Sequence, residues 1–324
     1  MIASSRLSAL AFTVLAAFFG MTSADADPGH PHLLWSNDHA AYRSYDPRGA
    51  DRFFRPTRRT ARPLRIDDDY LVESLKTLSG EHDRVLANRG SQAGRAAARD
   101  FLRKEFEGMG YTVSEQAYGS GTNLIAEKSG KSGKFLVMSA HYDSMSNKGA
   151  DDDGSGVISL LGTARMLREV TLKHGIRFVA FDEEERGLVG SQAYAKMLVK
   201  KGEKPIILGD VEMEMLGWNA RKDGKFHVIS CKRADSDFLV GAFVQAVRNL
   251  GNGLQITEAC TDRSDHASFW DQGMPAVVSS QNFFGGDSNP CYHRACDDVA
   301  HMHLDFFLKL AETAANAVRL IVAE

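Results

Sequence analysis

One short stretch places the strongest limit on how this chain can fold. Residues 176–181 form an apolar run, and four consecutive acids at 182–185 follow it directly. An apolar run of this length is typical of a strand buried in a parallel sheet, and such sheets bind ligands beyond the carboxyl ends of their strands. The acids occupy that position. They can also simply open the next helix, where the helix dipole stabilises negative charge.

Strand-like and helix-like patterns alternate along most of the chain. Apolar spacing predicts helices over 67–78, 92–109, 157–167, 191–200, 237–250 and 304–322, and strands over 111–118, 122–127, 134–140, 176–181, from 206, and 276–279. Such alternation implies parallel pairing with right-handed crossovers. We therefore expect one α/β domain over residues 66–324, a three-layer α/β/α arrangement around a mostly parallel, mixed and twisted sheet.

The first 65 residues differ from the rest in composition. In residues 1–26, Arg6 precedes an apolar stretch and small residues follow it, which is typical of a secretory signal peptide. Residues 27–65 are rich in Pro, Arg and His, and we interpret them as an extension or a prosegment. The protein is thus expected to be secreted or periplasmic, with no membrane span after signal removal.

Net charge argues against one class of partner, and cysteine content indicates that disulfide bonds are possible. The net charge of -3 gives no overall field that would attract nucleic acid. An oxidising compartment permits disulfides, and four cysteines allow three pairings. We favour Cys291 with Cys296, and leave the pairing of Cys231 and Cys260 open.

Histidines and carboxylates recur where strands are expected to end. His141 follows the strand at 134–140, and Asp143, two residues later, could accept the second N–H of a metal-bound imidazole. The three acids at 151–153 precede a helix, so they either cap that helix or contribute to a site.

Two further segments add candidate ligands. In the strand from residue 206, Asp210, Glu212 and Glu214 alternate with apolar residues, so they share one face and need water or cations there. His293 lies between Cys291 and Cys296, where a disulfide would rigidify its loop. Three carboxylates with two imidazoles and no thiolate suit two zinc ions that share one carboxylate.

Six motifs together resemble the zinc-dependent aminopeptidases typified by bacterial secreted leucyl aminopeptidases, the family that includes glutamate carboxypeptidase and glutaminyl cyclase. They are AHYDS at 140–144, GADDDGSG at 149–156, EERGLVGS at 184–191, EMLG at 214–217, RSDHASF at 263–269 and CYHRACD at 291–297. The resemblance covers the chain from residue 67 onward and implies a zinc exopeptidase-like fold.

The resemblance also implies roles for individual residues. Two zinc ions per chain would be held by His141, Asp152, Glu185, Glu214 and His293, with Asp152 as the bridge and Glu184 as the general base. It implies a cis peptide bond between Asp152 and Asp153, and substrate contacts by Arg263 and Tyr292. His266 is the rival for the last ligand position, but the resemblance makes it a neighbour.

One departure from the family pattern concerns Glu214, because an aspartate is usual at this position. Asp210 and Glu212 share its face and could substitute for it. The implied activity is hydrolysis of the N-terminal peptide bond of peptides that have a free N-terminus, by a metal-activated hydroxide. The alternatives are glutaminyl cyclase or carboxypeptidase chemistry on the same fold, and a metal-free, non-catalytic binding ectodomain.

Overall fold

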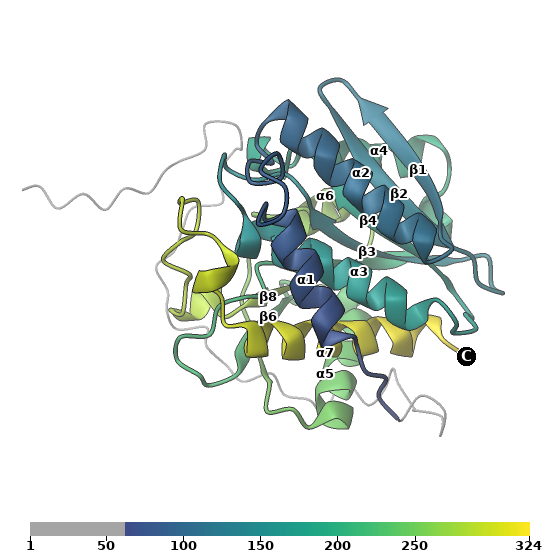
Figure 1. Cartoon of the computed structure of the whole chain (residues 1–324). Coiled ribbons are helices and arrows are strands. Elements are labelled where there is room, and N and C mark those ends of the chain that lie inside the picture. Colours follow the sequence, from purple (N-terminus) through teal and green to yellow (C-terminus); the bar gives the residue numbers. More distant parts are fainter. Residues whose placement is uncertain (1–61) are drawn as a thin grey trace, which may run out of the picture. The chain divides into compact units, whose positions relative to one another are not determined.

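A computed structural model describes residues 62–324, in which helices cover an eight-stranded sheet (Figure 1). The expected signal peptide and most of the expected extension lie outside the described residues. The strands are Thr112–Tyr118 (β1), Gly121–Lys128 (β2), Phe135–His141 (β3), Gly175–Phe181 (β4), Ile207–Glu214 (β5), Lys225–Ile229 (β6), Gln255–Thr257 (β7) and Ala276–Gln281 (β8). The helices are Asp68–Leu78 (α1), Gln92–Gly108 (α2), Gly156–Leu167 (α3), Val189–Lys200 (α4), Asp237–Leu250 (α5), His266–Asp271 (α6) and Leu304–Val322 (α7).

The sheet is mixed, with a parallel centre. Its strand order is β1-β2-β4-β3-β5-β8-β6-β7. Strands β4, β3, β5 and β8 are mutually parallel neighbours, whereas β1 and β2 on one side and β6 against β8 on the other are antiparallel. This confirms the expected α/β class. It also brings the carboxyl ends of β3, β4 and β5 to the same edge.

Helices pack on both faces of the sheet, which makes the three expected layers. Helices α1, α2, α3, α5 and α7 share one apolar core with the sheet, and α4 and α6 share a second core on its other face. Figure 1 shows α1, α2, α3 and α7 in front of the sheet. Strand β4 contributes Phe178 to the first core and Val179 to the second, so it is apolar on both faces, as its sequence indicates.

Local sequence signals explain several element boundaries. The Asp67 side chain caps α1 by accepting the N–H of Tyr70, and Ser91 caps α2 in the same way. Helix α5 ends where Gly251 adopts a left-handed conformation with φ 57°. The predicted helices at these places are confirmed to within two residues.

Three elements were not predicted, and one prediction needs correction. Strand β7 and helix α6 are too short to show a period, and β6 carries the polar His227 inside the protein. Helix α3 was expected to bury one apolar face, but ten of its residues are buried, because α1, α7 and the sheet surround it.

The cysteines form two disulfides, Cys291–Cys296 and Cys231–Cys260. The first confirms the favoured pair, and the second answers the question left open. The end of the expected extension is attached to the domain: the backbone N–H and C=O of Leu64 both bond to the Asn316 side chain on α7, and Arg65 pairs with Glu312.

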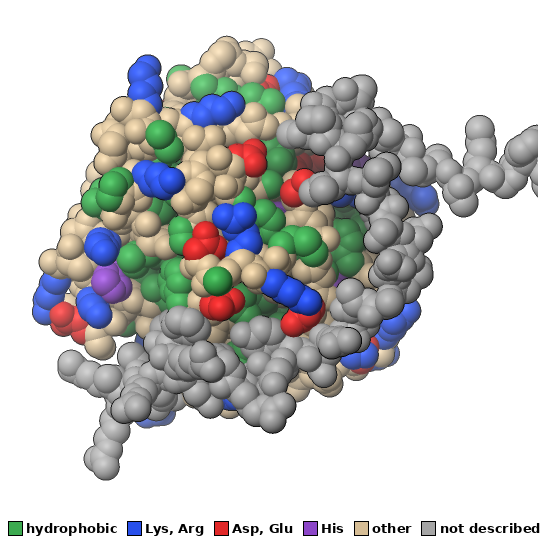
Figure 2. Space-filling model, turned by 180° about the vertical axis from the view of Figure 1, so that it is seen from behind, with side chains coloured by type: hydrophobic (Ala, Val, Ile, Leu, Met, Phe, Trp, Pro, Cys, Tyr) green, Lys and Arg blue, Asp and Glu red, His purple; other side chains and the backbone are tan. Residues whose placement is uncertain are grey.

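The surface of the domain shows charges of both signs. In Figure 2, basic and acidic side chains are interspersed with apolar ones over the part of the rear face that is visible. Within residues 62–324, no helix is long and apolar enough to cross a membrane.

Candidate active site

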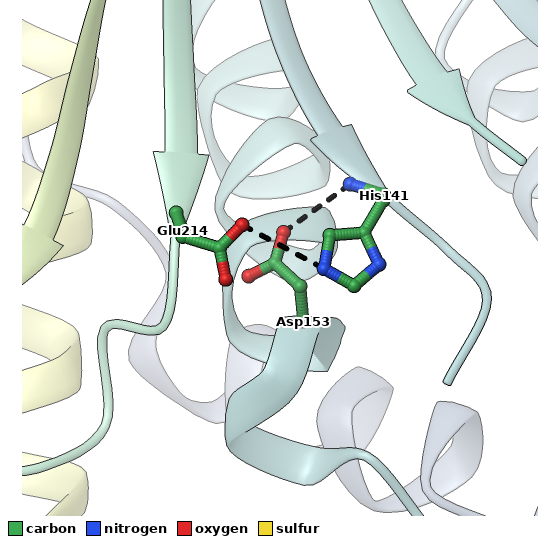
Figure 3. A group of neighbouring side chains, drawn as sticks. All are labelled: His141, Asp153 and Glu214. Atoms are coloured by element: carbon green, nitrogen blue, oxygen red, sulfur yellow. Dashed lines mark hydrogen bonds and ion pairs between the residues drawn. The ribbon is translucent and has the colours of Figure 1, made fainter. Parts of the chain in front are cut away.

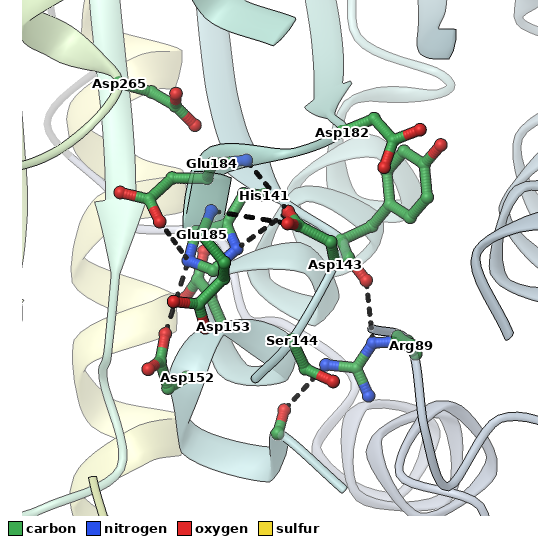
Figure 4. A network of polar contacts seen from close by, with 12 residues as sticks. Arg89, His141, Asp143, Ser144, Asp152, Asp153, Asp182, Glu184, Glu185 and Asp265 are labelled. Atoms are coloured by element: carbon green, nitrogen blue, oxygen red, sulfur yellow. Dashed lines mark hydrogen bonds and ion pairs between the residues drawn. The ribbon is translucent and has the colours of Figure 1, made fainter. Parts of the chain in front are cut away.

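Polar side chains from four segments meet beyond the carboxyl ends of the parallel strands. His141 ends β3 and Glu214 ends β5, while Glu184 and Glu185 lie in a short helical turn after β4. Asp152 comes from the turn Ala150–Ser155, which leads into α3. Figure 4 shows most of these side chains directed toward one another. The convergence follows from topology, because neighbouring parallel strands end at one edge.

A first group, which we call the inner cluster, consists of His141, Asp152 and Glu214. The Nε2 atom of His141 lies 3.3 Å from Oδ1 of Asp152 and 3.6 Å from Oε2 of Glu214. Figure 3 shows the imidazole and the Glu214 carboxylate facing each other, with the neighbouring side chain of Asp153 drawn between them. Only 1% of the His141 side chain is exposed, so these charges interact with little screening.

A second group, the outer cluster, consists of Asp152, Glu185 and His293. The Nε2 atom of His293 lies 3.2 Å from Oδ2 of Asp152 and 3.0 Å from Oε2 of Glu185. The two oxygens of Asp152 therefore face two different imidazoles. The His293 side chain is 34% exposed, so the imidazole of the outer cluster lies nearer to solvent than that of the inner cluster.

Asp153 is also close to the inner cluster, but its oxygens are already occupied. A ring nitrogen of His141 and one carboxylate oxygen each of Asp153 and Glu214 lie within 4.8 Å of one another, close enough to hold a metal ion. However, Asp153 accepts the backbone N–H groups of His141, Gly156 and Met215 at 3.0–3.2 Å. We therefore assign Asp152 to the inner cluster, and regard Asp153 as the residue that ties the turn to β3, α3 and β5. The peptide bond between Asp152 and Asp153 is cis, as the resemblance implied.

The three consecutive acids thus divide between two tasks. Asp151 accepts the N–H of Gly217 and the side-chain amides of Gln281 and Asn289. Asp153 accepts the N–H of Gly156 at the start of α3, which is the capping role considered for this triplet. Asp152 alone faces the histidines. Capping and site formation therefore occur side by side.

The acids after β4 divide in the same way. Asp182 and Glu183 are buried, and Arg95 on α2 approaches both carboxylates, at 3.0 and 3.6 Å. Glu184 and Glu185 instead turn toward the histidines. Helix α4 begins only at Val189, so none of the four acids lies in its first turn.

Asp143 supports both the imidazole and the glutamates. Its carboxylate accepts the N–H groups of Glu184 and Glu185 at 3.1 and 3.3 Å, and its Oδ1 lies 3.3 Å from Nδ1 of His141. Asp143 therefore lies where it can orient the His141 ring. Glu184 lies somewhat farther from that ring, with Oε2 3.9 Å from Nε2 of His141.

Burial and neighbouring charges shift the pKa values of several groups in this site. Burial, together with the charges of Glu214, Asp265 and Glu185, raises the pKa of Glu184 well above its usual range. Burial also raises the pKa of Glu185, to about 7. Burial lowers the pKa of His293, but Asp152 and Glu185 raise it more, to about 10. Several carboxylates thus share a space with few positive charges.

The donor set fits divalent cations. Oδ2 of Asp152 and Oε1 of Glu185 are buried and accept no hydrogen bond, although buried oxygens are normally paired. Two imidazoles and three carboxylates, with no thiolate, match the nitrogen and oxygen ligands of a catalytic zinc site. Cations would both satisfy these oxygens and offset the excess negative charge.

Of the remaining candidate residues, only Tyr292 contacts a residue of either cluster. Tyr292 stacks on the His293 ring, with centroids 3.8 Å apart, whereas Arg263 is exposed and its N–H donates to Thr261. His266 is held by Glu212, 2.7 Å away, rather than by either cluster. Asp210 bonds to Ser139. Glu212 and Asp210 are thus both bound to other residues, so neither replaces Glu214 in the inner cluster.

One acid near the site was missed. Asp265 is fully buried, and neither of its oxygens accepts a hydrogen bond. Its carboxylate lies near Glu184 in Figure 4. The only sequence signal is its place in the RSDHASF motif, and nothing in the spacing separates it from an exposed loop residue.

The chain is similar in sequence to several named proteins. Yeast aminopeptidase Y is 30% identical over 210 residues, which cover 60% of this chain and 38% of that protein. Leupeptin-inactivating enzyme 1 of Streptomyces exfoliatus is 28% identical over 279 residues, covering 77% of this chain and 62% of that protein. The chain thus spans less than two thirds of the length of either relative.

The fold is similar to that of a zinc aminopeptidase from Bacillus subtilis, with a TM-score of 0.57 and 25% identity over 63% of this chain and 50% of that chain. Residues 123–318, more than half of the sequence, match the family described as Peptidase family M28. This match contains His141, Asp152, Glu185, Glu214 and His293. The chain therefore belongs to peptidase family M28.

Proposed function

We propose that this protein is a secreted or periplasmic aminopeptidase that uses two zinc ions to hydrolyse the N-terminal peptide bond of peptides. The observation that carries the proposal is the position of Asp152, whose two oxygens face His141 at 3.3 Å and His293 at 3.2 Å. A carboxylate shared in this way suits a bridge between two cations. The names of the relatives, two of which are aminopeptidases, support the activity.

Each residue has a specific task in this proposal. The inner cluster would hold one ion and the outer cluster would hold the other. Zinc, when bound, polarises the scissile carbonyl and lowers the pKa of the attacking water. Glu184 accepts the proton of that water and returns it to the departing amine. Asp143 orients the His141 ring and, through two backbone N–H groups, the glutamate turn.

The surplus of carboxylates explains a preference for a free N-terminus. The ammonium group of a peptide is attracted to the acids around the two clusters, and this places the first peptide bond beside Glu184. Tyr292, half-buried against His293, is positioned to contact the substrate or the developing oxyanion. Arg263 is exposed, so we assign it at most a contact with the outer part of a substrate.

The substitution Glu184→Gln tests the proposed general base. We expect kcat to fall by about 10²–10⁴-fold, because the proton acceptor is lost, while two zinc ions remain bound. The measurement is turnover of an aminoacyl amide together with zinc per chain. Glu169→Gln, an exposed acid after α3, is the control and should retain full activity. Near wild-type turnover of Glu184→Gln at full zinc loading would rule out this role.

A substrate panel separates the proposal from its alternatives. Peptides with a free amine should be cleaved, N-acetylated peptides should not, and blocking the C-terminus should have little effect. Carboxypeptidase chemistry would give the opposite pattern. One zinc ion per active chain, with cyclisation of N-terminal glutamine, would favour a glutaminyl cyclase. A folded protein that binds no metal would favour the non-catalytic ectodomain.

A further inference from the structure

Arg89 has the largest fully buried side chain in the described part of the chain. It lies between α1 and α2, ahead of residues 123–318 that match the peptidase family. It belongs to none of the motifs that marked the site. A buried arginine is expensive unless its charge and its donors are satisfied, so its contacts need an explanation.

All the hydrogen bonds of the Arg89 guanidinium go to backbone carbonyls. Nε donates to the carbonyl of Tyr142 at 2.7 Å, and Nη2 donates to that of Gly149 at 2.7 Å. Nη1 donates to Lys148 at 2.6 Å and to Leu78 at 3.0 Å. The first two contacts lie at opposite ends of the loop over residues 142–149, and Figure 4 shows Arg89 against this loop.

This loop joins two residues of the inner cluster. Tyr142 directly follows His141, and Gly149 directly precedes the turn Ala150–Ser155 that carries Asp152. The separation of His141 and Asp152 therefore depends on how the two ends of the loop are held together. The planar fork of one guanidinium reaches both ends, which the single nitrogen of a lysine cannot do.

The packing around Arg89 leaves little room for the loop to shift. A Cβ added to Gly90 would lie 2.6 Å from the carbonyl oxygen of Ser144. Gly149 has a φ of 54°, and a Cβ there would lie 2.8 Å from Nη2 of Arg89. Glycine is thus required on both sides of this contact.

The positive charge of Arg89 acts on the acids of the site, although its guanidinium forms no ion pair with them. Within residues 62–324, no carboxylate forms an ion pair with its guanidinium at 4.0 Å or less. The acidic charges that raise its pKa belong to Asp297, Asp143, Asp153 and Asp152, all in or beside the two clusters, although burial lowers that pKa more. Asp297 in turn accepts the N–H groups of Asp151 and Asp152. Arg89 is therefore a fixed positive charge behind an acidic site.

We propose that Arg89 is a positioning residue: it fixes both ends of the 142–149 loop so that His141 and Asp152 keep the separation that ion binding requires. Arg89 touches neither ion nor substrate. This inference rests on the proposed function, because it concerns the same ions.

Arg89→Lys tests the proposal, since it keeps the charge but loses the fork. We expect zinc affinity to fall by about 10–100-fold, as when a supporting group behind a ligand is lost. The cobalt-substituted protein should show an altered visible absorption spectrum, which reports ligand geometry. At saturating zinc, kcat should fall while KM changes by less than about threefold, because substrate contacts are intact.

Arg177→Lys is the matched control. Arg177 is also largely buried, on β4, where it pairs with Glu127 and Glu203 and lies over the Phe135 ring. Its replacement should lower thermal stability and leave both zinc affinity and the cobalt spectrum unchanged. If Arg89→Lys behaves like Arg177→Lys in these two readouts, Arg89 is only structural and the proposal is overturned.

A second variant decides the matter if Arg89→Lys does not fold. Gly90→Ala keeps the arginine but pushes a methyl group against the carbonyl of Ser144. Weaker zinc binding by Gly90→Ala supports the proposal, and unchanged zinc binding overturns it. A wild-type protein that binds two ions but releases no N-terminal residue would contradict the proposed function and leave the role of Arg89 intact.

Discussion

The inner and outer clusters share Asp152, yet they are built from different parts of the fold. The other inner residues, His141 and Glu214, end β3 and β5, two paired strands at the centre of the sheet. The other outer residues, Glu185 and His293, come from a short helical turn and from a disulfide-closed loop. The His141 side chain is 1% exposed and that of His293 is 34% exposed.

This difference indicates how each cluster keeps its shape. An inner residue cannot move without disturbing a sheet that is buried on both faces, so the inner geometry is set by the global fold. An outer residue can move with its own loop, so the outer geometry depends on local restraints such as Cys291–Cys296. We therefore expect the inner ion to be bound more tightly and exchanged more slowly than the outer ion.

The substitution Asp152→Asn should have the largest effect, because it removes a charged ligand from both clusters at once. We expect both ions to be lost, and activity to fall beyond the roughly 10²–10⁴-fold range expected for loss of the general base. Zinc per chain and turnover are the measurements. Asp305→Asn, an exposed acid at the start of α7, is the control. One ion retained at full affinity would contradict the shared position of Asp152.

A pair of histidine substitutions should separate the two clusters. His141→Ala leaves buried carboxylates without a partner, so we expect loss of the inner ion and about 3–5 kcal/mol of stability. His293→Ala exposes its carboxylates to water, and should lose the outer ion with little effect on the free energy of unfolding. Chelator titration and thermal unfolding measure both. Equal stability losses in the two variants would mean that the clusters do not differ as described.

The outer cluster should also be sensitive to pH. The pKa of His293 without an ion is about 10, above the ordinary value near 6.5, so the ring is protonated at neutral pH and zinc must displace that proton. Zinc affinity should then rise about tenfold per pH unit between about pH 7, above which Glu185 is ionised, and about pH 10, because one proton is displaced in this range.

We expect the stability of the ion-free protein to show the opposite trend with pH. The contribution of His293 is fully present below pH 6.5, and is lost as the pH rises toward about 10. The proton released from His293 on zinc binding can be measured by calorimetry of zinc binding in two buffers of different ionisation enthalpy. Zinc binding without proton release at pH 8 would contradict the prediction.

Opening the Cys291–Cys296 disulfide should have the smallest effect. With both cysteines changed to Ser, we expect outer-ion affinity to fall by up to about tenfold, the inner ion to be unchanged, and stability to fall by about 2 kcal/mol, since the loop is short. The matched control changes Cys231 and Cys260, whose separation is 29 residues. It should cost about 3–4 kcal/mol and leave outer-ion affinity unchanged. An outer affinity that is insensitive to Cys291–Cys296 would show that the loop is rigid without it.

Sequence patterns were sufficient for the parallel strands at the centre of the sheet, whose ends carry residues of both clusters. The apolar run of β4 predicted a doubly buried strand, and the alternation around it predicted parallel neighbours whose ends converge. Both are long, local signals that burial of apolar side chains enforces. Strand β7 and helix α6 escaped prediction because three and six residues are too few to show a period.

Local patterns could not decide between neighbouring acids. Asp151, Asp152 and Asp153 are chemically identical, and only their contacts assign two of them to backbone N–H groups and one to the histidines. Local patterns also could not choose between His293 and His266 as a ligand. The structure does, because the His266 ring is bound to Glu212. No sequence signal marked Arg89, because its partners are backbone carbonyls, which any residue supplies.

The sequence by itself determined the α/β class, the strand ends where ligands gather, and the residue types suited to a pair of cations. Those properties follow from periodicity and from side-chain chemistry, both of which are local. The tertiary structure decided which oxygen faces which imidazole, which acids serve the backbone instead, and which arginine holds the loop between His141 and Asp152. These choices depend on distances between residues far apart in the chain, and only the folded packing sets them.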